Sequence, residues 1–60
     1  MDHKKDLTAI EAVIVWLLRG LNYHQHEIAA VFRVNQRCVH EVLSGKKHTS
    51  AKRIAASLRV

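Results

Sequence analysis

Apolar residues recur along this chain with the period of an α-helix, in four blocks that short polar segments separate. Strands are not indicated, because the two-residue alternation typical of them is absent and aromatic residues are few. The chain contains no proline, and its two glycines, Gly20 and Gly45, stand where helical blocks end. The pattern predicts an all-α protein of four short helices, forming one domain over residues 1–60.

The first block predicts a helix from about Leu7 to Arg19, which Gly20 ends. Thr8 and Glu11 have the spacing of a capping box, and Asp6 is a competing N-cap. The apolar positions expected to face the core are Leu7, Ile10, Ile14, Leu17, Leu18 and Leu21.

The rest of this first helix is also largely apolar, and a helix that is apolar nearly all round is buried nearly all round. A chain of 60 residues buries only about 60% of its extended surface, and the apolar fraction of 48% is high for such a small basic domain. We therefore expect a homodimer, with Trp16 and Val15 as anchors. The alternative is that Trp16 fills the core of the monomer. The residues expected at the interface are Ala12, Val15, Trp16, Arg19 and Leu58.

The second predicted helix runs from His24 or Gln25 to Phe32, although capping-box spacing between Asn22 and Gln25 allows an earlier start. The third runs from about Gln36 to Ser44, with Asn35 as its N-cap and Gly45 at its end.

The fourth predicted helix begins near Ser50, with Thr49 or Ser50 as its cap. It should pack on the first helix, either in the same chain or across a dimer. Its apolar stripe is Ala51, Ile54, Ala55 and Leu58.

Residues 25–44, QHEIAAVFRVNQRCVHEVLS, resemble the helix-turn-helix family of bacterial and phage regulators. The resemblance places Ala29 where the two helices touch, and Val39 and Val42 on the inner face of the second helix. The departure is Arg33, where the family prefers glycine because the turn often needs a positive φ. The overlapping stretch at residues 28–47, IAAVFRVNQRCVHEVLSGKK, is also similar to small one-domain regulators of mobile elements.

The positive charge is concentrated in one half of the chain. Residues 1–32 hold three basic and four acidic side chains, whereas residues 33–53 hold six basic and one acidic, which gives local charges of −1 and +5. A basic segment placed on such a motif is typical of a phosphate-binding surface. The alternative is a solvated basic surface without a ligand.

The resemblance implies that the second helix of the motif enters the major groove of DNA. Arg37 can bind guanine bidentately and Gln36 can pair with adenine, while Glu41 either steers Arg37 or accepts from cytosine. The expected base contacts are Gln36, Arg37, His40 and Glu41. The expected phosphate contacts are Tyr23, His24, Gln25, Arg33, Asn35, Ser44, Lys46, Lys47 and His48.

Other classes of site lack the necessary residues. The histidines have no metal-ligand spacing, since His24 and His26 would point about 200° apart on a helix. Neither a catalytic triad nor a Gly-rich phosphate loop is present, so we expect no enzyme activity, no cofactor and no small-molecule ligand. The apolar run at residues 9–18 is too short to span a bilayer and contains Glu11, and no signal peptide is recognisable.

The sequence thus predicts a whole small protein that binds double-stranded DNA as a homodimer at an inverted repeat. It would act as a transcriptional repressor or autoregulator of a phage or other mobile element. A cytoplasmic, nucleoid-associated location is expected, and the single cysteine fits it. The alternative is an adaptor or anti-activator that has the helix-turn-helix shape but binds a protein instead of DNA.

Overall fold

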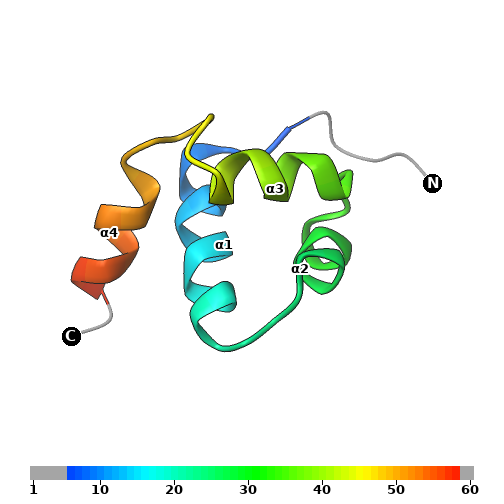
Figure 1. Cartoon of the computed structure of the whole chain (residues 1–60), viewed down its shortest axis with the longest axis horizontal. Coiled ribbons are helices and arrows are strands. Elements are labelled where there is room, and N and C mark those ends of the chain that lie inside the picture. The colour runs from blue at the N-terminus through cyan, green and yellow to red at the C-terminus, as the bar shows by residue number, and fades with distance from the viewer. Residues whose placement is uncertain (1–5, 59–60) are drawn as a thin grey trace.

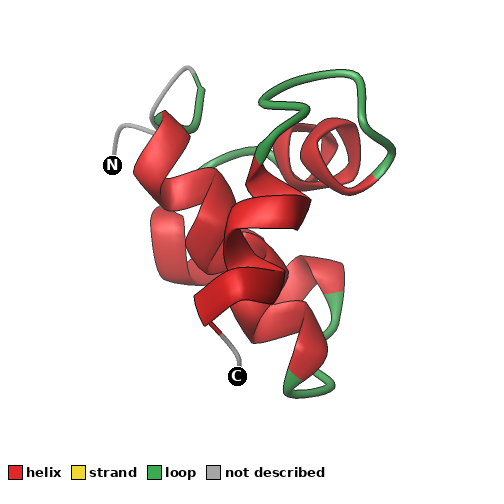
Figure 2. Ribbon diagram, turned by 90° about the vertical axis from the view of Figure 1, so that its left-hand side faces the viewer, coloured by secondary structure: helices red, strands yellow, loops and turns green. Residues whose placement is uncertain are grey.

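The computed structural model describes residues 6–58, which form four helices and, within that range, no strand (Figure 1). The helices are α1 (Ala9–Gly20), α2 (Gln25–Phe32), α3 (Gln36–Leu43) and α4 (Ala51–Leu58). The α1 helix contacts each of the other three, and α2 also packs on α3. Figure 2 shows the helices from the side, joined by loops. The expected all-α class and the four helices are confirmed.

The N-terminus of α1 has the capping box that the sequence predicts. The Glu11 backbone N–H donates to Thr8 Oγ1 at 3.2 Å, and the Thr8 N–H donates to Glu11 Oε1 at 2.9 Å. The N-cap is therefore Thr8. The competing candidate, Asp6, accepts from the neighbouring Leu7 N–H at 2.8 Å.

The end of α1 differs from the sequence-based expectation. Gly20 is still helical, Leu21 is the C-cap, and the left-handed residue is Asn22, with φ of 71°. Asparagine tolerates this conformation better than most residues. The loop ends where the His24 N–H donates to Glu27 Oε1 at 2.8 Å, so α2 begins at Gln25 and Asn22 is not its cap.

The core lies where α1, α2 and α3 meet. Its fully buried large side chains are Val15 from α1, Ile28 from α2, and Val39 and Val42 from α3. Other apolar residues close the edges of this cluster, namely Leu7, Ala12, Ala29, Val34, Cys38 and Ala51.

The prediction of which residues of the first helical block enter the core was confirmed for Leu7, which is buried, and for Leu18, which packs against the core, but it was wrong for most of the other positions. Ile10 and Leu21, expected in the core, are 75% and 68% exposed, whereas Ala12 and Val15 are fully buried. The neighbouring helices dock on the side with small and β-branched residues, where helices approach closely. Ala12 and Val15 are therefore covered within one chain and cannot contact a second copy.

Trp16 is half-buried and packs against the core, as the alternative interpretation held. The Lys52 ammonium group lies 5.4 Å from the centre of its ring, which is within range of a cation–π interaction. This contact joins α1 to α4. Ala51 and Ala55 are buried as well, so α4 packs on α1 of its own chain.

The longest helix in residues 6–58 is α1, with 12 residues. None of the described helices has the length and apolar character needed to cross a membrane.

Candidate nucleic-acid interface

The α3 helix has two faces of opposite character. Cys38, Val39 and Val42 are buried against the other helices, while Gln36, Arg37 and His40 are exposed. Asn35 is the N-cap of this helix, and its Oδ1 accepts from the Arg37 backbone N–H at 2.9 Å. The cap thus fixes the start of α3, and the exposed face presents a row of hydrogen-bonding side chains to solvent.

The turn between α2 and α3 is built around a left-handed residue. Arg33 has φ of 56° and ψ of 44°, and its N–H donates to the Ala30 carbonyl at 3.3 Å. Val34 follows with its N–H on the Ala29 carbonyl at 3.1 Å and its side chain buried. The turn therefore has the positive φ that glycine usually provides, with an exposed arginine side chain in its place.

We expect Arg33→Gly to stabilise the fold, because glycine adopts a positive φ without the steric cost of a Cβ. The gain should be about 0.5–1 kcal/mol in the free energy of unfolding, reduced by the greater chain entropy of unfolded glycine. Urea denaturation measures it. Arg33→Ala is the matched control, since it removes the guanidinium group but keeps the Cβ. A gain with alanine equal to that with glycine would assign the effect to charge, not to the backbone.

Lys46, the first basic residue of the loop after α3, is exposed to solvent. Ser44 is the C-cap, its Oγ donates to the Glu41 carbonyl at 3.2 Å, and Gly45 has φ of 84°. A side chain at Gly45 would be strained by that φ, although space is open around it. Lys46 follows Gly45. Ser44 and Lys46 thus lie next to the C-terminal end of the exposed α3 face.

Lys47 is exposed, but its ammonium group is paired with carboxylates of its own chain. Its Nζ lies 2.6 Å from Asp6 Oδ2 and 3.7 Å from Glu41 Oε1. Glu41 is half-buried and lies beside Lys47. The sequence had suggested an ion pair between Glu41 and Arg37, but in the structure Glu41 pairs with Lys47. The pairing of Asp6 with Lys47 was not identified from the sequence, because 41 positions separate the two residues and no local pattern links them.

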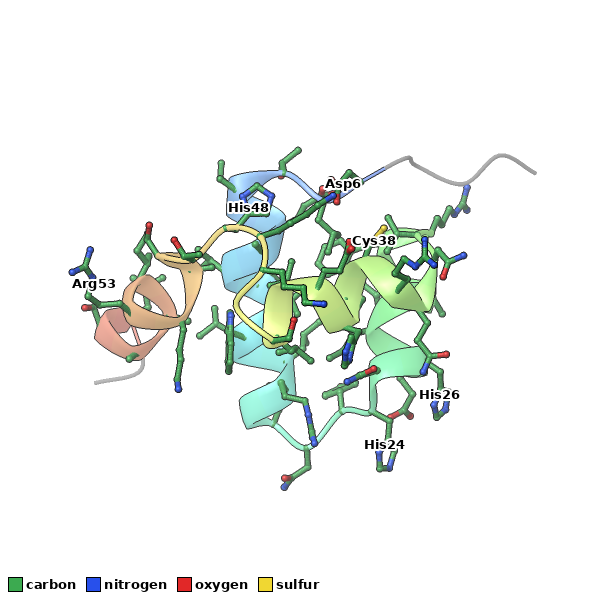
Figure 3. The ribbon with its side chains drawn as sticks, turned by 45° about the horizontal axis from the view of Figure 1, so that its top comes forward. Asp6, His24, His26, Cys38, His48 and Arg53 are labelled. Carbon is green, nitrogen blue, oxygen red and sulfur yellow. The ribbon has the colours of Figure 1, made fainter. Side chains whose placement is uncertain are left out.

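His48 is also turned towards the N-terminal segment (Figure 3). Its Nε2 donates to the Leu7 carbonyl oxygen at 2.9 Å. Asp6 and Leu7, which precede α1, thus both form contacts with the loop between α3 and α4. Of the phosphate contacts expected in this loop, Lys46 is exposed, whereas Ser44, Lys47 and His48 have hydrogen-bond partners in the chain.

The ion pair of Asp6 with Lys47 makes stability depend on pH at both extremes. The hydrogen bond from Lys47 lowers the pKa of Asp6 below 3.8, and the same bond raises the pKa of Lys47 above 10.5. The ion pair contributes fully to the free energy of unfolding between pH 3.8 and pH 10.5. This stabilisation is lost as pH falls through the lowered pKa of Asp6, and also as pH rises through the raised pKa of Lys47.

We therefore expect Asp6→Asn to lower the thermal midpoint slightly at neutral pH, and the difference from wild type to vanish well below pH 3.8. Added salt should also reduce the difference, because both groups are solvent-accessible. Thermal scans of both proteins across pH and salt test this. A difference that persists at low pH and high salt would show that the ion pair is not its source.

The start of α2 carries the other expected phosphate contacts. Tyr23 and His24 are exposed and Gln25 is half-buried. The rings of His24 and His26 stack at 5.7 Å with an angle of 6° between them, so the expectation that they point apart was wrong. The reason is that His24 is the N-cap and has extended backbone, so helical spacing does not apply to it.

Among residues 6–58, no three His, Cys, Asp or Glu side chains are grouped so that they could hold a metal ion. Arg19, expected at a dimer interface, donates from Nη1 to the Tyr23 carbonyl at 3.3 Å and so stabilises the loop between α1 and α2.

No protein-family model, curated protein or solved structure matched the chain.

Proposed function

We propose that this protein binds double-stranded DNA sequence-specifically, with α2 and α3 acting as a helix-turn-helix and α3 entering the major groove. The observation that carries the proposal is the division of α3 into a buried apolar face and an exposed face of hydrogen-bonding side chains. A two-fold homodimer would read an inverted repeat and act as a transcriptional repressor or autoregulator, in the cytoplasm on the nucleoid.

The base contacts are assigned to the exposed side chains at the N-terminal end of α3. Arg37 has the planar fork that binds guanine O6 and N7, and Gln36 can pair with adenine N6 and N7. His40 lies one turn further along the same exposed face. Glu41, half-buried against Lys47, orients the loop that follows α3 rather than reading a base.

The phosphate contacts are assigned to exposed groups on either side of α3. Arg33 lies in the preceding turn and Lys46 in the following loop, and both side chains are exposed. The N-terminus of α2 and the exposed Tyr23 and His24 just before it add further contacts, because helix N-termini favour anions. The local charge of residues 33–53 supports this assignment.

Selection of bound duplexes from a random DNA pool tests the proposal. The expected result is a consensus with inverted symmetry, whose half-site centres are separated by about one helical turn, or 34 Å. A matched selection with Gln36→Ala/Arg37→Ala should lose that consensus. A wild-type pool that stays random would contradict sequence-specific binding.

The alternative function is that of a protein adaptor or anti-activator. The observation favouring it is the exposed apolar surface of α1 and α4, which includes Ile10, Leu21 and Leu58. An adaptor would retain its activity when the exposed face of α3 is made neutral, whereas a DNA-binding regulator would lose it. The double variant used in the selection therefore separates the two functions.

A further inference from the structure

Two helices leave large apolar side chains uncovered on the surface of this small domain. The exposed side chains form what we call the α1–α4 patch, consisting of Ile10, Ile14, Leu21, Ile54 and Leu58. On α1 they recur at helical spacing, with the half-buried Leu17 between them. Ile54 and Leu58 are one turn apart on α4.

Helix geometry places both parts of the patch away from the contact between Trp16 and Lys52. Lys52 lies over the Trp16 ring and so forms one contact between these helices. Ile14 precedes Trp16 by two residues and Ile54 follows Lys52 by two, so each is about 200° around its helix from that contact. The helices themselves pack together through Ala51 and Ala55.

The patch also lies away from α2 and α3. These helices pack on the face of α1 that carries Ala12 and Val15. Ile14 is two positions from Ala12 and therefore about 200° around the helix from it. A partner on the patch would leave the exposed face of α3 uncovered.

The size of the patch matches what a dimer needs. The exposed parts of the five side chains come to on the order of 500 Å², near the upper end of about 300–600 Å² for the largest patch on a monomer. The whole chain exposes only 4429 Å². Two copies joined at this patch would bury about 1,000 Å² before any polar rim is counted, which is the area at which specific interfaces begin.

We propose that a second copy of this chain covers the α1–α4 patch in a two-fold symmetric dimer. In such an interface each copy supplies the same apolar residues, so uncharged side chains meet uncharged side chains. This interface keeps Leu58 from the one expected from the sequence, but it does not use Ala12 and Val15, which are buried, or Arg19, which lies at the loop to α2. The inference rests on the proposed function only for the idea of a homodimer.

Sedimentation equilibrium of the full chain, without DNA, tests the interface. Wild type should approach twice 6.9 kDa as its concentration rises. Ile10→Asp and Leu58→Asp should each raise the dimer dissociation constant at least about tenfold, since each places two carboxylates in an apolar contact. Both positions are exposed, and circular dichroism will verify that the variants remain helical.

Val31→Asp is the matched control, because Val31 is apolar and 60% exposed but lies on α2, outside the patch. It should leave the dissociation constant unchanged. A wild-type protein that stays monomeric at every concentration would overturn the proposal. So would a dimer that resists both patch variants or dissociates with Val31→Asp.

The same variants separate this interface from the proposed function. A monomeric Ile10→Asp protein that still binds single half-sites weakly would support both. A wild-type dimer that dissociates with the patch variants but binds no DNA would support the interface and contradict the DNA-binding function.

Discussion

Ile28→Ala is expected to remove a large part of the free energy of unfolding of this protein. Ile28 is fully buried on α2, between α1 and α3, and its removal leaves a cavity that three short helices cannot readily close. Such substitutions cost about 2–5 kcal/mol. A domain of 60 residues has a total stability of roughly 3–9 kcal/mol, so a large fraction is lost.

Urea denaturation followed by helical circular dichroism measures this effect, with Val31→Ala as its control. Val31 is a branched apolar residue on the same helix but is exposed, so its replacement should change stability by no more than about 0.5 kcal/mol. If Ile28→Ala cost no more than Val31→Ala, then Ile28 would not be a core residue.

Arg37→Ala is expected to cost about 1–3 kcal/mol of DNA-binding free energy per half-site and to relax base preference at one symmetric pair of positions. The reason is that Arg37 lies on the exposed face of α3 near its N-terminal end, where a guanidinium group can reach the edge of a guanine. Binding to scrambled duplex should change much less. Fluorescence anisotropy with the selected operator and a scrambled duplex measures both affinities.

Lys46→Ala should behave differently, because the exposed Lys46 follows α3 and is assigned to a phosphate. Binding to every sequence should weaken alike, and the salt dependence should fall by about one charge for each lost contact. Titrations over a salt series distinguish the two variants. If Arg37→Ala weakened operator and scrambled duplex equally, Arg37 would be a phosphate contact. If neither variant changed binding, the adaptor function would be preferred.

The sequence by itself determined the helices and most of their ends. The Thr8 and Glu11 capping box, the Asn35 cap and the left-handed Gly45 depend on groups within a few residues of each other, so local spacing identifies them. The resemblance also identified Arg33 as a position where the turn often needs a positive φ. The buried face of α3 was predictable as well, since its polar and apolar residues are segregated.

Only the tertiary structure decided which side of α1 faces the core. That helix is apolar almost all round, so its periodicity favours no single face. The docking of α2 and α3 on Ala12 and Val15 made the choice, and it left Ile10 and Leu21 in solvent. Two of the residues expected at the interface, Ala12 and Val15, therefore belong to the core, whereas Leu58 is exposed.

The pairing of Lys47 with Asp6 and of His48 with the Leu7 carbonyl also required the fold. In each pair the partners are 41 residues apart. These residues lie close together because α3 packs on α1. Contacts between neighbours in sequence are fixed by local backbone geometry, whereas contacts at such separation depend on how helices dock, which no local pattern encodes.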